Sequence, residues 1–302
     1  MNCPTTETLP NQHEIVSRWT DDDCGPLITI LCIAYNHEAF IEEAINSFLL
    51  QETSFPFEIL IHDDASTDRT AEIIRKYQDS YPRLIKPIYQ TENQYSKGVR
   101  IIPYLLSKTD SKYIAICEGD DYWTDKQKLS IQVDYLEKHP ACSLCFHQSI
   151  KRFESPTGKQ EPFVKKRINA EIKTEDIIKD WFIPTQSIVL RRSALPATLP
   201  AWLHHIMNVD WAIQLLCSLK GYIQYIDREM SVYRIHEGGL NSTAFGKIDR
   251  LYNSMIRTLL FFDDYSDYKF SIKIKNKIAK LLITLLLIRF CNSTGIKRYL
   301  KS

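Results

Sequence analysis

LITILCIAYNHEAFIEEAINSFLL, residues 27–50, combines a strand pattern and a helix pattern in one stretch. Its first part, residues 27–34, is an almost unbroken apolar run, as expected of a buried strand. After Tyr35 the apolar residues recur at helical spacing, at Phe40, Ile41, Ala44, Ile45, Phe48 and Leu49. A buried strand that leads into an amphipathic helix is typical of a βαβ unit, so the stretch predicts a parallel sheet covered by helices.

The same alternation continues along the chain. Further strands are expected near residues 57–61, 84–89, 113–117, 142–146, 187–190 and 222–226. Helical patterns fall between them, at residues 71–77, 100–107, 125–139 and 210–219, and a short capped helix is expected in the section that begins at residue 174. We therefore predict an α/β fold with a mostly parallel sheet flanked by helices. Its domain spans residues 25–245, with residues 1–24 as a tail, residues 151–167 as an exposed excursion and residues 246–302 as a helical C-terminal extension.

Two acidic pairs follow two of these predicted strands. Asp63 and Asp64 end the second strand, and Asp120 and Asp121 end the fourth. Because open α/β sheets bind ligands beyond the carboxyl ends of their strands, we expect the two pairs to converge on one crevice. Adjacent carboxylates suit a hard divalent cation, Mg²⁺ or Mn²⁺, that bridges nucleotide phosphates. The alternative is that each pair caps a helix or ends a solvated loop, because Asp is common at turns.

Composition and missing motifs exclude several classes of protein. Hydrophobic residues make up 44% and charged residues 25%, which is typical of a globular domain. The 38 Lys and Arg residues balance 37 Asp and Glu, so no overall charge attracts nucleic acid and no nucleic-acid partner is expected. The turn at residues 34–37 lacks G-x-G-x-x-G, and the chain contains no G-x-x-x-x-G-K-[ST]. A glycine-rich phosphate loop is therefore absent.

The N-terminus and the cysteines predict a cytoplasmic protein. Residues 1–23 lack the layout of a secretory signal. The longest apolar stretch, residues 281–288, is shorter than the roughly 20 residues of a membrane-spanning helix. Most of the 8 cysteines lie in apolar runs, and the C-x-x-C of Cys142 and Cys145 has no second pair at zinc spacing. We expect these cysteines to be reduced and to bind no metal.

Taken in order, the motifs resemble those of the family 2 glycosyltransferases of the GT-A fold, the inverting enzymes that build bacterial surface polysaccharides. The matching segments lie between Leu27 and Ser242 and read ITILCIAYNHEAFIEEAINSFLLQ, FEILIHDDASTDRT, KYIAICEGDDYWTDKQKLSIQ, NVDWAI and YRIHEGGLNS. Each segment alone is a weak signal, but the ordered set at strand ends is specific. The resemblance implies that a sugar passes, with metal assistance, from a nucleotide-sugar donor, expected to be UDP-linked, to a glycan or lipid-linked acceptor.

The resemblance also assigns the donor site. Ala34 and Tyr35 would border the nucleotide base, and Asp64 would recognise it, as the family's counterpart does for uracil. Asp120 would hold the ribose or the sugar. Arg100 would reach the phosphates, although the family's usual Ala-Arg-Asn stretch is missing here.

The metal and the base are assigned in the same way. Asp121 would bind the cation, and His236 would complete its coordination or contact the diphosphate. Asp210, before an apolar helix, would be the general base that takes the proton of the acceptor hydroxyl. The alternative for Asp210 is a plain helix N-cap. This chain has Val209 where many members have Glu, and Glu118 either joins the site or is turned away by strand alternation.

Some alternatives stay open from sequence alone. The same fold could serve as a non-catalytic nucleotide-sugar or glycan-binding module. Trp123, Trp202 and Trp211 are candidates to stack on a sugar ring, Trp123 being the best placed. The basic and leucine-rich residues 269–301 suit either peripheral contact with an anionic membrane or packing against the domain.

Overall fold

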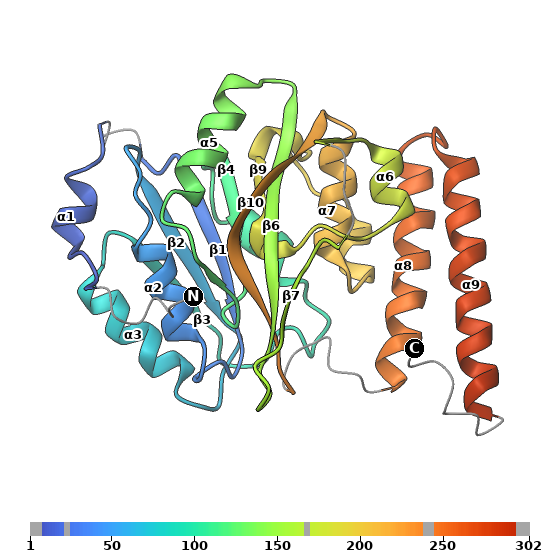
Figure 1. The fold of residues 1–302 in the computed structure, drawn as a ribbon, viewed down its shortest axis with the longest axis horizontal. Coiled ribbons are helices and arrows are strands. Elements are labelled where there is room, and N and C mark those ends of the chain that lie inside the picture. The colour runs from blue at the N-terminus through green and yellow to red at the C-terminus, as the bar shows by residue number, and fades with distance from the viewer. Residues whose placement is uncertain (1–7, 21–24, 166–169, 238–244, 294–302) are drawn as a thin grey trace.

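The strand and helix expected from residues 27–50 are β1 and α2 in the computed structural model, which describes residues 8–20, 25–165, 170–237 and 245–293. The first half of the chain follows the predicted alternation closely. Its elements are β1 (Ile28–Ala34), α2 (Ile41–Leu49), β2 (Phe57–Asp63), α3 (Thr70–Ser80), β3 (Ile85–Tyr89), α4 (Ile101–Leu106), β4 (Tyr113–Ile116), β5 (Tyr122–Trp123) and α5 (Lys128–Lys138). The α/β fold class is confirmed (Figure 1).

The second half adds longer strands and more helices. Its elements are β6 (Cys142–Phe153), β7 (Gln160–Pro162), β8 (Glu171–Ile172), α6 (Thr174–Lys179), the 3-10 turn η2 (Thr185–Ser187), β9 (Val189–Arg191), the 3-10 turns η3 (Arg192–Ala194) and η4 (Ala201–His205), α7 (Val209–Ser218), β10 (Tyr222–Ile235), α8 (Phe245–Tyr265) and α9 (Ser271–Ser293). A short helix, α1 (Gln12–Val16), lies in the segment expected to be a tail, and its Ile15 is buried against the sheet's core.

The strands form one mixed sheet in the order β3-β2-β1-β4-β9-β6-β10-β5. The long pairings of the described strands, β1 with β2 and β4, β2 with β3, and β6 with β10, are parallel. The short pairings that involve β5, β7, β8 and β9 are antiparallel. The mostly parallel sheet is therefore confirmed, with short antiparallel additions.

Two predicted strands are longer in the structure than the sequence suggested. β6 continues from the expected 142–146 to Phe153, and β10 from 222–226 to Ile235. The expectation of an excursion over residues 151–167 is wrong at its start, because residues 151–153 extend β6 and β7 pairs back onto it. The polar side chains of these extensions resemble a loop, but their backbone groups pair across the β6–β10 ladder.

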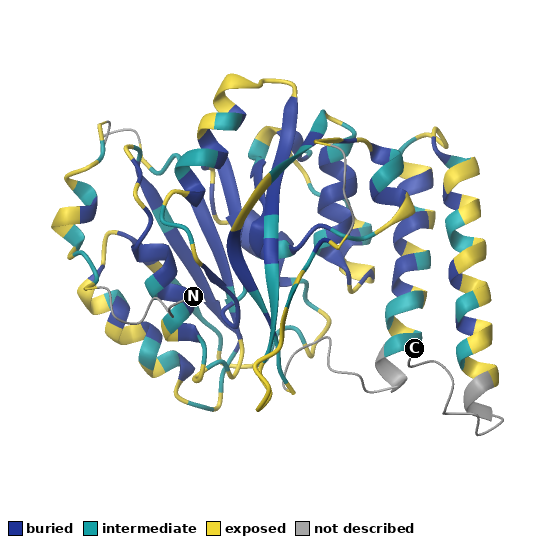
Figure 2. Ribbon diagram, viewed as in Figure 1, coloured by how far each residue is buried: buried dark blue, intermediate teal, exposed yellow. Residues whose placement is uncertain are grey.

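Alternating residues of the sheet feed two hydrophobic cores, one on each face. In β1, Ile28, Ile30, Cys32 and Ala34 join the core beneath α2, α3 and α5, whereas Leu31 joins the core beneath α4, α6 and α7. Figure 2 shows the strands buried between these helices. Each face of the sheet is therefore covered, as a parallel sheet requires.

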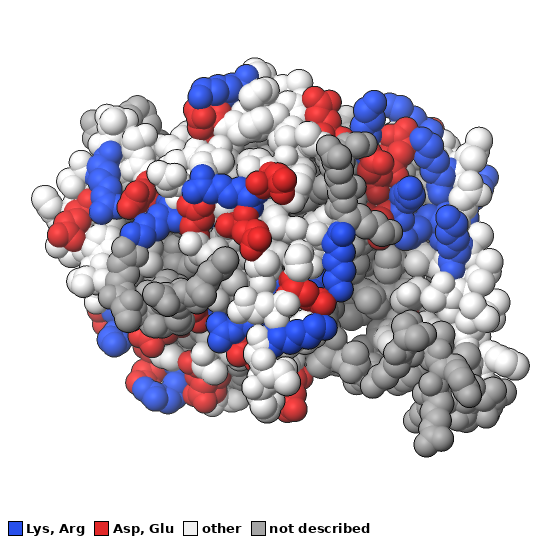
Figure 3. All heavy atoms as spheres, in the orientation of Figure 1, with Lys and Arg blue, Asp and Glu red and all other residues white. Residues whose placement is uncertain are grey.

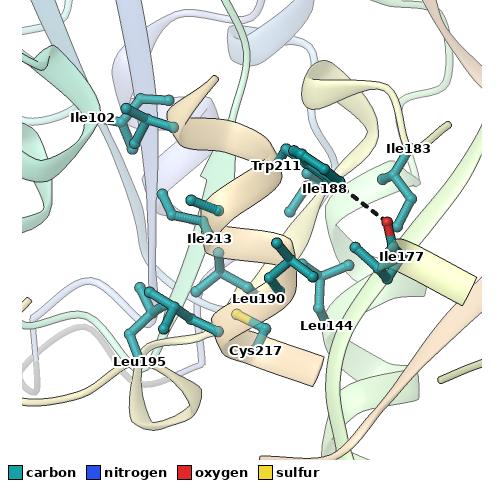
Figure 4. Packing of buried hydrophobic residues seen from close by; sticks show 14 of the residues in the cluster. Ile102, Leu144, Ile177, Ile183, Ile188, Leu190, Leu195, Trp211, Ile213 and Cys217 are labelled. Atoms are coloured by element: carbon teal, nitrogen blue, oxygen red, sulfur yellow. Dashed lines mark hydrogen bonds between the residues drawn. The ribbon is translucent and has the colours of Figure 1, made fainter. Parts of the chain in front are cut away.

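Helix α7 is packed tightly into the second core (Figure 4). Trp211 is fully buried, and its indole Nε1 donates a hydrogen bond to the carbonyl oxygen of Ile177 at 3.0 Å. Ile183, Ile188 and Leu190 belong to the same core. The first turn of α7 is thereby held in a fixed position on the sheet.

The two C-terminal helices form an antiparallel layer beyond α7 (Figure 1). Met255, Leu259 and Phe262 of α8 belong to the same core as α7. α9 is the outermost helix and buries Ile274, Leu281 and Leu285 on its inner side. No helix within the described ranges is long and apolar enough to cross a membrane.

Candidate active site

The loops after β1 and β2 are joined by hydrogen bonds where the two parallel strands end. The backbone N–H of Asp64 donates to the carbonyl oxygen of Ala34 at 2.9 Å. Asn36, in the left-handed region at φ 54°, accepts on its side-chain oxygen from the N–H of Thr67 at 2.8 Å. Tyr35 is left 43% exposed between these contacts. The hydrogen bonds therefore fix the two loops as a rim, on which the side chain of Tyr35 stays partly exposed.

Asp64 organises the loop that follows β3. Its two carboxylate oxygens accept from the backbone N–H groups of Gln94 and Tyr95 at 2.7 and 3.0 Å. The guanidinium of Arg100 lies 5.6 Å from the centre of the Tyr95 ring and donates to the carbonyl oxygen of Ile206. Asp64 and Arg100 thus connect the end of β2, the loop at residues 92–100 and the segment that leads into α7.

Asp120 lies beside two histidines. Its Oδ2 is 3.0 Å from Nε2 of His236 and 3.9 Å from Nε2 of His37. Burial alone would raise the pKa of Asp120, but the hydrogen bond with His236 and the nearby His37 hold it below the usual value. The other oxygen, Oδ1, is buried without a hydrogen-bond partner among the described residues. The structure therefore brings together Asp120 and His236, two of the predicted site residues.

Asp121 is held by Arg234, two residues before His236. The backbone N–H of Arg234 donates to Oδ1 of Asp121 at 2.8 Å, and its Nη1 donates to the carbonyl oxygen of Asp120 at 2.6 Å. Burial, followed by the negative charges of Asp120 and Glu118, raises the pKa of Asp121 well above its usual value. The antiparallel pairing of β5 with β10 creates these contacts, because it aligns Val232 with Tyr122.

Arg234 anchors the acidic loop through its own ion pairs. The side chain is 3% exposed, forms an ion pair with Glu43 of α2 and lies 3.4 Å from the carboxylate of Glu154. Its guanidinium lies 4.4 Å from the centre of the Tyr122 ring. A planar guanidinium suits this arrangement because it donates in several directions at once. In the sequence, Arg234 lies within the segment YRIHEGGLNS, two residues before His236, and no site role was predicted for it.

Glu118 and Asp210 complete the acidic cluster. Burial, then the charges of Asp120 and Asp210, raises the pKa of Glu118 to about 8, so Glu118 faces the site. Asp210 lies in the first turn of α7 and accepts from the hydroxyl of Thr185 at 3.1 Å. Burial raises the pKa of Asp210 as well, against the opposing effect of these hydrogen bonds. Glu118 therefore lies within electrostatic reach of Asp120 in its own loop and of Asp210 in α7.

Gly119 allows the acidic loop to lie against β1. A Cβ at this position would come within 2.8 Å of Cδ1 of Ile41 and 3.0 Å of Nδ1 of His37. It would also lie 3.3 Å from the side chain of Ala34, which places Ala34 directly beneath the loop. His37 is a residue that the sequence reasoning passed over, although it closes the turn at residues 34–37.

The tryptophans differ from their expected role. Trp123 and Trp211 are 2% and 0% exposed, so neither ring offers a face to a sugar. Trp202 stacks on Phe261 at 5.8 Å. Trp181 instead lies half-buried beside the acids, stacked on Trp211 at 6.3 Å and hydrogen-bonded to Asp210. Tertiary packing determines the position of Trp181, and no sequence motif marks this residue.

A family model described as "Glycosyl transferase family 2" matches residues 29–198. An uncharacterized protein of Mycobacterium tuberculosis is 37% identical over 72% of this chain and 61% of its own length. The UDP-Glc:alpha-D-GlcNAc-diphosphoundecaprenol beta-1,3-glucosyltransferase WfaP of Escherichia coli is 29% identical over 75% of this chain and 84% of its own length. The chain thus spans about three fifths of the length of the mycobacterial relative.

Solved structures share the fold at low sequence identity. S. aureus TarS in complex with UDP-GlcNAc covers 84% of this chain and 71% of its own, with a TM-score of 0.61 and 18% identity. The mannosyltransferase PcManGT of Pyrobaculum calidifontis, in complex with GDP-Man and Mn²⁺, covers 92% and 82%, with a TM-score of 0.53 and 15% identity. This likeness shows the GT-A fold. Since the family model covers more than half of the chain and includes both acidic pairs, the chain belongs to glycosyltransferase family 2.

Proposed function

We propose that the chain is an inverting glycosyltransferase of surface-polysaccharide synthesis, which moves a sugar from a nucleotide-sugar donor to a glycan or lipid-linked acceptor. One observation carries the proposal: Glu118, which lies beside Asp120 and Asp121 in the loop after β4, is within electrostatic reach of Asp210 on a separate helix. That arrangement provides one place for a charged leaving group and another for a proton acceptor. The complexes of TarS with UDP-GlcNAc and of PcManGT with GDP-Man support a nucleotide-sugar donor.

The donor base is proposed to lie on the rim formed by the loops after β1 and β2. Tyr35 is exposed there and can stack against a planar base, whereas Ala34 before it is fully buried beneath the acidic loop. Asp64 would recognise the base either directly or through the loop that its carboxylate orders. Arg100 then lies on the same loop with its permanent positive charge available to the phosphates. We favour UDP because WfaP is named for a UDP-linked donor.

The acidic cluster fits a divalent cation, Mg²⁺ or Mn²⁺. The charge of Asp120 raises the cost of ionising the buried carboxyl group of Asp121, and one oxygen of Asp120 has no partner among the described residues. Asp121 and His236 would hold the ion, with the donor phosphates as further ligands, because the described His, Cys, Asp and Glu residues form no complete metal-binding group by themselves. A bound cation would neutralise the diphosphate that leaves. PcManGT was solved with Mn²⁺.

Asp210 is proposed as the general base. The acceptor hydroxyl loses its proton to Asp210 as its oxygen bonds to the anomeric carbon of the sugar, and the bond from that carbon to the diphosphate breaks. Attack from the face opposite the leaving group inverts the anomeric carbon. Burial raises the pKa of Asp210 above its usual value, which makes the carboxylate a stronger base.

Two substitutions separate donor binding from transfer. We expect Asp121→Asn to abolish metal-dependent binding of UDP, measured by calorimetric titration with UDP, GDP, CDP and dTDP, each with and without Mn²⁺. Asp210→Asn should leave that binding intact and lower turnover by at least about 100-fold, the usual contribution of general-base catalysis. Binding without turnover in the unmodified chain would favour a non-catalytic sugar-binding module. Full turnover by Asp210→Asn would contradict the assignment of the base.

We also propose that α9 rests on the inner, anionic surface of the cytoplasmic membrane, where a lipid-linked acceptor would be found. The outward face of this helix is apolar, with relative exposures of 79% for Ile272, 46% for Leu282, 58% for Ile283, 66% for Leu286 and 57% for Leu287. At 3.6 residues per turn, Lys280 and Arg289 flank this face on its two sides, and Lys275 lies within it. α9 contains no Asp or Glu. An apolar face bordered by basic residues is typical of a helix lying in a membrane interface.

The distribution of charged side chains on the surface agrees with the proposed membrane contact of α9. In Figure 3, Lys and Arg side chains, with some acidic side chains among them, gather over the upper part of α9 and neighbouring α6, and uncharged surface follows lower on α9. WfaP is named for an acceptor on diphosphoundecaprenol, a lipid carrier. The membrane contact would therefore bring the active site to its acceptor.

Sedimentation with lipid vesicles tests this contact. We expect the chain to bind phosphatidylglycerol-containing vesicles but not pure phosphatidylcholine, and to dissociate as salt rises. The double variant Ile283→Glu, Leu286→Glu should lose binding but keep its affinity for UDP. Arg69→Glu, a 70% exposed site on the opposite side of the molecule, is the control and should bind as the unmodified chain does. Undiminished vesicle binding by the double variant would refute the proposal.

A further inference from the structure

The carboxylate of Asp210 is held by the backbone of its own helix at Trp211 and, from outside that helix, by the turn η2. The hydroxyl of Thr185 donates to Oδ2 of Asp210 at 3.1 Å, and the side chain of Trp181 is a second hydrogen-bonding partner. The residue before Asp210, Val209, is apolar, 5% exposed and packed in the core, so it cannot support the carboxylate. Resting on the proposed role of Asp210 as the base, we infer that Thr185 is the residue that positions it.

The turn that carries Thr185 is itself fixed. The N–H of Ser187 donates to the carbonyl oxygen of Pro184 at 3.1 Å, and the hydroxyl of Ser187 donates to the same oxygen at 2.6 Å. Pro184 precedes the turn, and its ring restricts the backbone further. Thr185 therefore presents its hydroxyl from a backbone with little freedom.

Two buried side chains connect this turn to the acidic loop. The indole of Trp123, two residues after Asp121, donates to the carbonyl oxygen of Gln186 at 2.9 Å. The side-chain amide of Gln132 in α5 donates to the carbonyl oxygen of Ser187 at 2.9 Å. These hydrogen bonds fix the turn η2 relative to the segment that carries Asp121, the proposed metal ligand. A displacement of the turn would change the position of the base relative to the donor.

The Thr185 hydroxyl performs two tasks in this geometry. Its hydrogen bond selects one orientation of the Asp210 carboxylate, and orientation of a reacting group contributes to the rate before any bond changes. It also occupies Oδ2, so the acceptor hydroxyl meets a carboxylate that is already hydrogen-bonded. Thr185 is not proposed to contact the acceptor, because its hydroxyl acts only through the carboxylate of Asp210.

Removal of one hydroxyl tests the inference. Thr185→Val keeps the shape of the side chain and removes the donor, whereas Thr185→Ser keeps the donor. We expect Thr185→Val to lower kcat about 10-fold, the effect of one hydrogen bond to a charged group, with KM for the donor and the thermal midpoint unchanged. Thr185→Ser should restore kcat to near the original value. If the valine variant folds poorly, Thr185→Ala, measured at a temperature where it is folded, replaces it.

Comparison with Asp210→Asn separates the two proposals. An inactive Asp210→Asn together with a fully active Thr185→Val would overturn the positioning role and leave the base assignment standing. A fully active Asp210→Asn would overturn both. A Thr185→Val variant whose donor KM rises in proportion to the loss of kcat would show a general structural defect and also overturn the inference.

Discussion

Lys128 is a cation buried in the core of the sheet. The side chain is 0% exposed, and its Nζ has no hydrogen-bond partner within the part of the chain that the structure describes. The ring of Trp123, 4.0 Å away, favours the protonated amine by about 1–2 kcal/mol. Burial has the larger effect and lowers the pKa of Lys128 to about 7. The amine is therefore largely neutral at slightly alkaline pH.

This burial predicts a pH-dependent stability. Between pH 7 and about 10.4, the ordinary pKa of lysine, the unfolded chain binds a proton that the folded chain does not, so the free energy of unfolding rises with pH. Below pH 7 both states are protonated, and the buried charge is at its most destabilising. Lys128→Met should therefore raise stability at pH 7 by about 1–3 kcal/mol and flatten its rise toward pH 9.

Urea unfolding at pH 7, 8 and 9 measures the effect. Lys138→Met, on the same helix with a side chain 68% exposed, is the matched control and should keep the pH slope of the original chain. An unchanged slope in Lys128→Met would show that the buried amine does not titrate in this range.

Individual site residues could be predicted from the sequence where they lie at the end of a strand or the start of a helix. Asp120 was identified because it follows a strand, and Asp210 because it matches the family's base position before a helix; in the structure both act on the pKa of Glu118. Thr185 and Trp181 carried no such signal, because they reach Asp210 only through the packing of η2 against α7. Residues that act through tertiary contacts therefore escaped the sequence pattern.

The strands β6 and β10 show that prediction from the sequence is limited in the same way for whole strands. Their first residues are apolar and were predicted, but their extensions carry polar side chains and rely on each other for backbone hydrogen bonds. The extension of β10 matters for the site, because it carries Arg234 and ends beside His236. A strand stabilised by its neighbour cannot be recognised from its own composition.

The start of the β6–β10 ladder depends on a glycine. A Cβ at Gly221 would lie 2.2 Å from the carbonyl oxygen of Ala141, a backbone atom that cannot move aside alone. Gly221→Ala should therefore separate the two strands where Tyr222 pairs with Cys142, and lower the free energy of unfolding by about 1–3 kcal/mol. Urea unfolding measures the loss, with exposed Lys220→Ala as the control. Stability equal to that of the control would mean that the ladder begins later than the structure shows.

The C-terminal helix α8 contacts the start of α7, the helix that carries the proposed base. Asn208, the N-cap residue of α7, accepts on its side-chain oxygen from the hydroxyls of Ser254 and Thr258 in α8 at 2.5 and 3.2 Å. Asp210 follows in the first turn of α7. α8 therefore holds the beginning of the helix that carries the proposed base. The boundary predicted at residue 245 stays a prediction, and these contacts suggest that α8 folds together with the domain.

Truncation tests that dependence. Met255, Leu259 and Phe262 bury their side chains beside α7, and each contributes about 1.5–3 kcal/mol, which together approaches the 5–15 kcal/mol net stability of a typical domain. A chain that ends at residue 244 should therefore fail to fold, as measured by near-ultraviolet circular dichroism. A chain that ends at residue 270 loses α9 with its buried Ile274, Leu281 and Leu285, so it should be less stable than the full chain and should lose its binding to vesicles. A chain ending at 244 that folds and binds UDP would place the domain boundary before α8 and limit α8 to a peripheral role.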